Sequence, residues 1–270
     1  MQVVVFTSQK GGSGKTTLCG QLAVQAELSG AGPVAIIDTD PQGSLSGWWN
    51  ARKAQTPAFV RTHVDELAKD LKRLRMLGIQ LVFIDTQPSV TQVIAEIVDY
   101  ADLVVIPTRP SPHDLRAIGP TLDIVQRAEK PLVFAINGAT QRTRITGDVA
   151  VALSQHGTVA PTAVHNRIDF ATSMIKGGSV IEANPDGASA KEIGTLWTYL
   201  STRLERLHHD RDSVTFEGPL NASASKPAVE TRVPADAHPR PAHVGAAGFG
   251  SGAGVFGRRP SAMAPHTERD

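Results

Sequence analysis

The sequence of 270 residues lacks several features that define whole classes of protein, and cysteine is the clearest case. Cys19 is its only cysteine, so the chain cannot form an intramolecular disulfide, and a cysteine-only metal cluster within one chain is not expected. No apolar run approaches the roughly 20 residues of a membrane-spanning helix. The N-terminus also lacks the basic start and long apolar core of a signal peptide. We therefore expect a cytoplasmic protein that does not use a membrane.

Net charge is also nearly absent. The 27 basic residues (Lys and Arg) almost balance the 26 acidic ones, which leaves a formal net charge of +1. Bulk charge therefore does not select a nucleic acid or any other charged partner. A nucleic-acid surface, if the chain has one, would be a local patch.

Short apolar segments rich in Val and Ile recur along the chain, and none of them alternates with polar residues. Such segments are typical of strands that are covered on both faces, as in a parallel sheet. The expected strands are residues 3–6, 34–37, 81–84, 103–106 and 132–136, with a weaker one around Val159.

Segments with helical spacing lie between these strands. The first ends near Ser29, before Gly30, Gly32 and Pro33, and others are expected at 63–77, 91–100, 114–128, 146–156 and 180–207. Strand alternating with helix predicts right-handed crossovers. The expected fold class is α/β, with a doubly wound, mostly parallel sheet and helices on both faces.

The composition changes near residue 209. Seven prolines and seven glycines fall between residues 211 and 270, and the apolar residues there follow no period. Such a segment cannot bury enough surface to offset the entropy lost on ordering. We expect a folded domain over 1–209 and a disordered Gly/Pro/Ala-rich tail over 210–270.

The stretch S-Q-K-G-G-S-G-K-T-T, residues 8–17, stands between the first expected strand and the first expected helix. A glycine-rich backbone in that place curls so that successive N–H groups point inward, and the following helix adds its positive end. The stretch predicts a phosphate loop in which Lys15 reaches the β- and γ-phosphates and the Thr16 hydroxyl binds Mg²⁺. The nucleotide-binding candidates in it are Gly11, Gly12, Ser13, Gly14, Lys15, Thr16 and Thr17.

This loop departs from the common pattern G-x-x-x-x-G-K-[ST] in two ways. Gln9 replaces the first glycine, and Lys10 adds a second lysine at the early end of the loop. One lysine is enough to hold a nucleotide. The chemistry of the loop alone therefore leaves the role of Lys10 open.

Polar residues at the ends of three later strands complete the candidate site. Asp38 and Asp40 stand in D-T-D-P-Q-G-S, where one carboxylate could hold metal-bound water and the other could orient the attacking water. A turn that ends the strand, with no functional role, is an alternative interpretation of the same motif. Asp85 ends the strand at 81–84, the usual place of a Walker-B aspartate that acts on the metal. Asn137 ends the strand at 132–136, where its amide could read the adenine edge or form a turn.

The motifs K-G-G-S-G-K-T-T, D-T-D-P-Q and I-D-T-Q-P together resemble those of the deviant Walker A ATPases of the ParA/MinD superfamily. The stretches at 104–115 and 179–193 are most similar to small partition proteins of the ParF type. The resemblance covers about residues 1–207. It implies a P-loop NTPase fold and an ATPase that segregates or positions a plasmid, a chromosome region or a protein complex.

In this superfamily the early lysine reaches across an ATP-sandwich dimer to the phosphates of the partner subunit, and the resemblance implies that role for Lys10. It likewise implies that Asp40 is needed for hydrolysis. The implied cofactors are ATP and Mg²⁺, and the implied partners are a second copy of the chain and an adaptor protein of the ParB type. The residues that serve phosphate and metal are then Lys15, Thr16 and Asp85, with Asp38 acting through a metal-bound water.

ParA-like dimers also bind DNA without sequence preference, which implies association with the nucleoid in the ATP-bound state. Each basic candidate for this surface could equally be an ordinary solvated surface charge. The candidates are grouped because of the resemblance and not because of their spacing in the sequence. The DNA-binding candidates are Arg167, Lys176, Lys191, Arg203 and Arg206.

The nearest rival classes each require a feature that this sequence lacks. A MinD-type membrane ATPase needs a terminal amphipathic helix, which is not expected over residues 258–270, and a nitrogenase-type iron protein needs two cluster cysteines. A tyrosine kinase of this fold needs a tyrosine-rich tail. One alternative of a different class stays open, namely a metabolic P-loop enzyme resembling dethiobiotin synthetase that acts on a small molecule. Gln87 replaces a proline that is frequent in the superfamily, which leaves the geometry after Asp85 open.

Overall fold

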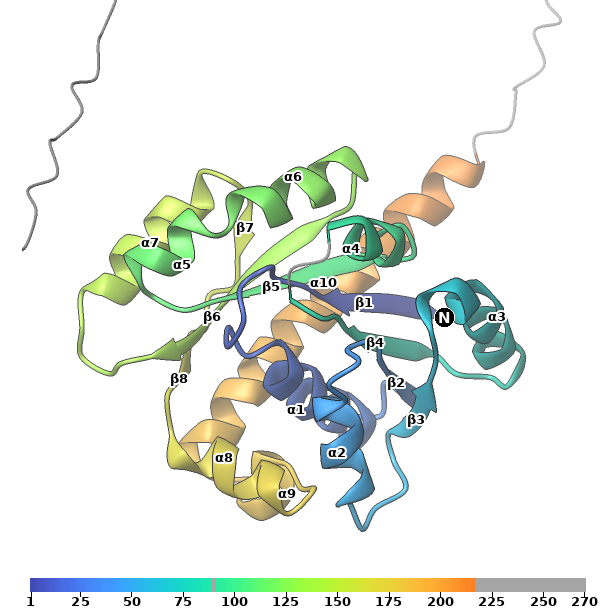
Figure 1. Ribbon diagram of the computed structural model, residues 1–270, viewed down its shortest axis with the longest axis horizontal. Helices are drawn as coiled ribbons and strands as arrows, with labels where there is room; N and C mark the ends of the chain where they lie inside the picture. The colour runs from blue at the N-terminus through green and yellow to red at the C-terminus, as the bar shows by residue number, and fades with distance from the viewer. Residues whose placement is uncertain (89–90, 217–270) are drawn as a thin grey trace, which may run out of the picture. The chain divides into compact units, whose positions relative to one another are not determined.

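The computed structural model of the chain describes residues 1–88 and 91–216. Their centre is an eight-stranded sheet in the order β3-β2-β4-β1-β5-β6-β7, with β8 paired to β6, and every strand pair in the described ranges is parallel. The sheet is drawn in Figure 1. Its strands are β1 (Gln2–Phe6), β2 (Val34–Asp38), β3 (Ala58–Arg61), β4 (Leu81–Asp85), β5 (Leu103–Thr108), β6 (Leu132–Ala139), β7 (Thr158–Val159) and β8 (Val164–His165).

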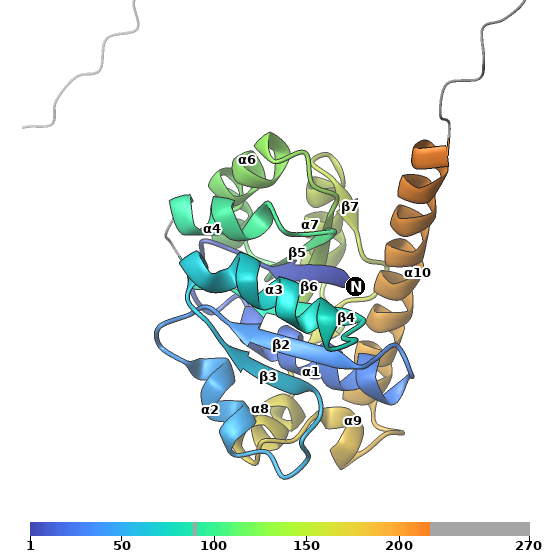
Figure 2. The same ribbon diagram turned by 90° about the vertical axis from the view of Figure 1, so that its right-hand side faces the viewer.

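Helices cover both faces of this sheet, which confirms the predicted fold class (Figures 1 and 2). One face carries α1 (Lys15–Leu28), α2 (Ser44–Asn50), α8 (Ile168–Ile175), α9 (Val180–Ala183) and α10 (Ala188–Phe216). The other carries the short 3₁₀ helix η1 (Val64–Glu66), α3 (Leu67–Met76), α4 (Thr91–Val98), α6 (Gly119–Arg127) and α7 (Ile145–Ser154). The short helix α5 (Pro112–Arg116) precedes α6.

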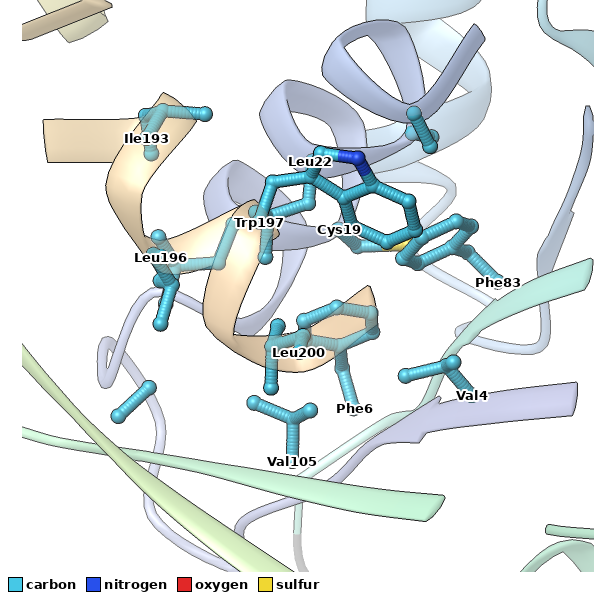
Figure 3. Packing of buried hydrophobic residues seen from close by; sticks show 14 of the residues in the cluster. Val4, Phe6, Cys19, Leu22, Phe83, Val105, Ile193, Leu196, Trp197 and Leu200 are labelled. Carbon is cyan, nitrogen blue, oxygen red and sulfur yellow. The ribbon is translucent and has the colours of Figure 1, made fainter. Parts of the chain in front are cut away.

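Strands β1 to β6 supply both layers of the core because successive side chains point to opposite faces of a sheet. On β1, Val4 and Phe6 join the layer under α1 and α10, whereas Val3 and Val5 join the layer under α4 and α6. Figure 3 shows the first layer, in which Trp197 of α10 lies close to residues of α1 and of the sheet. This double burial explains why the strands read as continuous apolar runs.

The position of β1 in the sheet determines where a ligand can bind. It lies between β4 and β5, so that the chain winds outward on one side through β2 and β3 and on the other through β6 and β7. Ligands of open α/β sheets bind beyond the carboxyl ends of the strands at such a switch point. The loop that follows β1 is the predicted phosphate loop, which therefore stands at the expected place.

Several short elements were not predicted from the sequence. Strand β3, strand β8 and helices α2 and α8 are too short to show a clear period. The helix expected over 180–207 is divided into α9 and α10, because the stretch between them contains Pro185 and Gly187. The helix expected over 114–128 is divided into α5 and α6, because Pro120 has no N–H to donate and stands in the first turn of α6.

The last helix is longer than the sequence suggested. Helix α10 continues past the expected domain boundary at residue 209 and ends at Phe216. No proline or glycine interrupts residues 208–216, and Gly218 and Pro219 are the first to follow. The rest of the predicted tail lies outside the described residues, so the tail stays a prediction.

Candidate nucleotide site

The loop between β1 and α1 has the backbone that a phosphate cradle requires. Gly12 and Gly14 take positive φ angles of 73° and 97°, and Gly14 caps the N-terminus of α1. A Cβ atom at Gly14 would lie 1.9 Å from Nδ2 of Asn137, which donates a hydrogen bond of 2.8 Å to the carbonyl of Ser13. A side chain at residue 14 would therefore displace the Asn137 amide and break its hydrogen bond to Ser13.

Lys15 lies in the first turn of α1 and is buried. Burial lowers the pKa of its ammonium group, although the carboxylates of Asp85 and Asp40 act in the opposite direction. Its Nζ atom lies 3.5 Å from the carbonyl oxygen of Lys10, which is at the long limit of a hydrogen bond. A buried ammonium group with such a weak partner is suited to bind a phosphate.

Asp85 stands at the end of β4, beside α1. Its Oδ2 accepts a hydrogen bond of 2.6 Å from the Thr16 hydroxyl, and its Oδ1 is buried without a hydrogen-bond partner. Burial raises the pKa of this carboxyl group to about 7, and the hydrogen bond from Thr16 offsets only part of the effect. A divalent cation would supply both the missing contact and the missing positive charge.

Asp38 and Asp40 lie at the end of β2, next to β4. Asp38 pairs with Asp85 in the register of the two strands, and its Oδ2 accepts hydrogen bonds of 2.8 Å from both the backbone N–H and the hydroxyl of Ser46. Asp40 is half-exposed in the following turn, where its Oδ1 accepts a hydrogen bond of 2.9 Å from the N–H of Gln42. The contact of Asp38 with Ser46 was not predicted, because neither residue forms a spaced motif with the other.

These residues fit Mg²⁺ bound together with a nucleotide. In the described part of the chain no group of three or more His, Cys, Asp or Glu side chains could hold a metal ion by itself. Mg²⁺ in phosphate sites needs only one or two protein ligands, because phosphate oxygens and waters supply the others. Thr16 and Asp85 would provide those ligands, with Asp38 close by, and the metal would neutralise charge on the phosphates.

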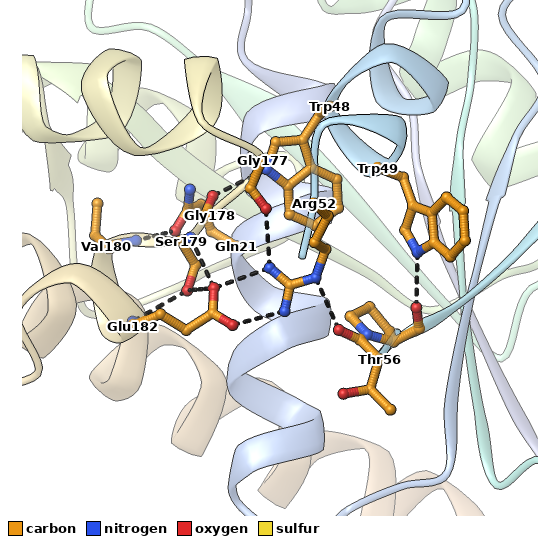
Figure 4. A network of polar contacts seen from close by, with 11 residues as sticks. Gln21, Trp48, Trp49, Arg52, Thr56, Gly177, Gly178, Ser179, Val180 and Glu182 are labelled. Carbon is orange, nitrogen blue, oxygen red and sulfur yellow. Dashed lines mark hydrogen bonds and ion pairs between the residues drawn. The ribbon is translucent and has the colours of Figure 1, made fainter. Parts of the chain in front are cut away.

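Helix α2, which begins just after Asp40, is held on its far side by a polar network (Figure 4). Arg52 forms two hydrogen bonds to the carboxylate of Glu182, and the indole N–H of Trp48 donates to the carbonyl of Gly178. Burial alone would raise the pKa of Glu182, but the hydrogen bonds from Arg52 and Ser179 outweigh it and lower that pKa. The network fixes the C-terminal end of α2 to α9 and to the segment before it.

The second lysine of the loop points elsewhere. The Nζ of Lys10 forms an ion pair with the carboxylate of Asp114, in the first turn of α5. The N–H of Gln9 donates to the hydroxyl of Thr121 on α6, at 3.1 Å.

The structure thus brings together the loop, the ends of β2, β4 and β6, and α5. The roles of Asp114 and Thr121 were not predicted, although Ser111 followed three residues later by an acid is a recognisable helix-start pattern.

Three of the five candidate DNA-binding residues line one groove. The groove runs along α10, has a volume of about 660 Å³, and is lined by Lys191, Arg203 and Arg206 with Tyr199 and neighbouring threonines. Arg167 instead forms an ion pair of 2.6 Å with Glu192. Lys176 is exposed at the end of α8 and does not line the groove.

The comparison with known families decides the relationship of the chain. The CobQ/CobB/MinD/ParA nucleotide-binding domain matches residues 4–155, which is more than half of the chain and includes the loop and the ends of β2, β4 and β6. The chain belongs to this family. It is therefore an ATPase of the ParA/MinD group, as the sequence motifs predicted.

Individual relatives of this ParA/MinD ATPase support the same family assignment. The maintenance of carboxysome distribution protein A of Halothiobacillus neapolitanus is 30% identical over 194 residues, which cover 68% of this chain and 88% of that protein. Protein ParA of Rhizobium radiobacter is 27% identical over 172 residues, covering 63% and 76%. Septum site-determining protein MinD of Pyrococcus horikoshii, solved with Mg-ADP, has the same fold at a TM-score of 0.64 and 13% identity over 76% of this chain and 98% of that chain.

Some predictions about this ParA/MinD ATPase stay open after these comparisons. They show the ParA/MinD group but not the ParF type in particular. The individual roles of the site residues also stay predictions, from the phosphate loop with Lys10, Lys15 and Thr16 to Asp38, Asp40, Asp85, Asn137 and the DNA-binding candidates. In the described residues no helix is both long enough and apolar enough to span a membrane.

Proposed function

We propose that the chain is a positioning ATPase that forms a sandwich dimer when it binds ATP. The dimer binds DNA without sequence preference, and an adaptor protein of the ParB type stimulates hydrolysis and thereby releases the dimer. In this cycle ATP acts as a reversible link between two subunits. The bound state would then reside on the nucleoid.

The observation that carries the proposal is that the two lysines of one loop have different partners. Lys15 is buried beside Asp85, where it can hold a phosphate of its own subunit. Lys10 is about one-third exposed, and its ammonium group pairs with Asp114 of α5 rather than with Asp85. A cation at the rim of the loop can contact the phosphates of a second subunit, as an arginine finger does.

The Lys10→Ala variant tests this separation of roles. We expect it to bind ATP within about threefold of the wild-type affinity, because Lys15 and the loop backbone remain. We expect it to lose the ATP-dependent dimer and most of its hydrolysis, because removal of a cation supplied in trans costs about a thousandfold in rate in related phosphoryl transfers. Analytical ultracentrifugation with a slowly hydrolysed ATP analogue measures the dimer.

Lys53→Ala, which removes an exposed lysine in the loop after α2, is the matched control and should behave as wild type. A Lys10→Ala protein with normal dimers and normal turnover would contradict the proposal. Wild-type protein that stays monomeric with the analogue would contradict it as well.

The groove on α10 supports the binding of DNA. Besides its cations, the groove is lined by the side-chain hydroxyl groups of threonines and Tyr199, and such groups are common donors to phosphate oxygens. Among the described residues that line it there is no Asp or Glu. Such a surface can hold a nucleic-acid backbone without reading bases.

The double variant Lys191→Ala/Arg206→Ala tests the groove. Both side chains are exposed, so the fold should not change. We expect weaker binding to DNA of any sequence, and a plot of log affinity against log salt whose slope is smaller by about 2, one unit for each lost phosphate contact. Fluorescence anisotropy of a random duplex across a salt series measures both quantities.

The control for this experiment is Lys72→Ala/Arg75→Ala, which removes the same charges from exposed positions on α3, on the other face of the sheet. If both double variants weaken DNA binding equally, net charge rather than the groove is responsible. The ATP-dependent dimer should form normally in both.

Turnover separates this proposal from a metabolic P-loop enzyme of the same fold. A positioning ATPase hydrolyses ATP slowly alone and faster with DNA and its adaptor, whereas a small-molecule ligase responds to its substrate. Turnover that needs neither DNA nor a protein, and follows a small molecule, would overturn the proposal. A gene for a small DNA-binding protein beside this one would indicate a plasmid or chromosome as cargo.

A further inference from the structure

The ion pair of Lys10 joins an accessible cation to a buried anion. The side chain of Lys10 is 34% exposed, whereas that of Asp114 is only 6% exposed. A buried carboxylate that loses its paired cation is costly, because that charge is then left without compensation. Asp114 therefore holds Lys10 more firmly than a surface carboxylate would.

Asp114 is itself held in place by the start of α5. Ser111 caps this helix, and its hydroxyl oxygen accepts a hydrogen bond of 3.1 Å from the N–H of Asp114. The same hydroxyl donates to Oδ2 of Asp114, the atom that also contacts Lys10. Pro112 at the first helical positions further restricts the turn. The acceptor for Lys10 is thus fixed before any partner arrives.

The early half of the loop is attached separately from the half that would hold phosphate. Gln9 is bound through its N–H to Thr121 of α6, and Lys10 is bound through its side chain to α5. The later half is bound to β6 through Ser13 and Asn137. Lys10 can therefore leave Asp114 by rotation of its own side chain, while the cradle around Lys15 stays in place.

We propose that Asp114 is a positioning residue that retains the Lys10 ammonium group in its own subunit until the phosphates of an ATP-bound partner compete for it. This inference rests on the proposed function, in which Lys10 acts across the dimer. Dimerisation then includes the cost of breaking the ion pair between Lys10 and Asp114. The pair sets how much ATP the protein needs before it dimerises.

The test is the Asp114→Asn variant, which keeps the shape of the side chain but removes its charge. We expect it to form the dimer at an ATP-analogue concentration lower by about fivefold or more, because a larger fraction of subunits then has a free Lys10. Analytical ultracentrifugation over an analogue titration gives the midpoint. A merely structural role of Asp114 predicts the opposite sign, since a damaged loop dimerises less readily.

Two further variants make the result specific. The double variant Lys10→Ala/Asp114→Asn should be as unable to dimerise as Lys10→Ala alone, because the effect of Asp114 passes through Lys10. Asp123→Asn removes an exposed carboxylate on α6 and should leave the midpoint as in wild type. Ser111→Ala should shift the midpoint in the same direction as Asp114→Asn but less, and it replaces Asp114→Asn if that protein does not fold.

The outcomes separate this inference from the function on which it rests. If wild type dimerises with the analogue and Lys10→Ala does not, but Asp114→Asn has an unchanged or higher midpoint, the role of Asp114 is wrong and the proposed function stands. If wild type itself does not dimerise, the proposed function fails first. Dimerisation restored by Asp114→Asn in the absence of Lys10 would also overturn the role of Asp114.

Discussion

Replacing Lys15 by alanine should reduce ATP affinity by about 100-fold or more, since a buried ammonium group gives charge-assisted hydrogen bonds to phosphates that no other side chain replaces. The charges that act on Lys15 within the described residues are the carboxylates of Asp85 and Asp40, which raise its pKa against the effect of burial. Without Lys15, these negative charges would face the negative phosphates directly. Isothermal titration with ATP and Mg²⁺ measures the loss.

The same variant should remain folded. Burial of Lys15 lowers its pKa, which shows that the folded protein holds the charged form at a cost. Removing it should leave the thermal stability without nucleotide unchanged or slightly higher, while the stabilisation by added ATP disappears. Lys53→Ala is again the control. Tight ATP binding by a folded Lys15→Ala protein would refute the assignment of the loop.

Replacing Asp40 by alanine should separate binding from hydrolysis. We expect ATP affinity and ATP-dependent dimerisation within about twofold of wild type. The carboxylate is half-exposed, and within residues 1–88 and 91–216 it accepts a hydrogen bond only from Gln42 of its own turn. We expect hydrolysis to fall by about 100-fold, the usual size of a positioned general base or water-orienting group. Phosphate release under saturating ATP gives the rate.

Asp65→Ala, which removes an exposed carboxylate from η1 at a distance in sequence from the site, is the matched control for Asp40. The dimer of Asp40→Ala should persist after ATP is added, whereas the wild-type dimer should decay as ATP is consumed. A dimer that hydrolyses ATP at the normal rate would contradict the role of Asp40. Loss of ATP binding would instead indicate that Asp40 supports the fold of the loop.

The sheet and the phosphate loop were predictable because their signals are local. Apolar runs of four or five residues mark buried strands, and the glycines before Lys15 mark a cradle wherever they lie between a strand and a helix. Asp38 and Asp85 could be placed at strand ends by the same reasoning. The structure adds that they are register partners on neighbouring strands. A single sequence does not show which strands are neighbours or in which register they pair.

The parts that could not be predicted depend on contacts between distant segments. Ser46 contacts Asp38 only because α2 turns back over β2, and Asp114 meets Lys10 only because β5 lies beside β1. Strand β3 is a short edge strand whose side chains are only partly buried, so its sequence has no long apolar run. The division between α5 and α6 could have been foreseen from Pro120.

The buried thiol of Cys19 has a practical consequence for measuring the dimer. Cys19 is fully enclosed in the core, and burial raises the pKa of its thiol, so it should resist maleimide reagents in the folded protein. A cysteine introduced at an exposed site can therefore carry a single fluorophore without removal of the natural one. Energy transfer between two labelled copies would follow subunit exchange in real time, and late reaction of Cys19 would report global unfolding.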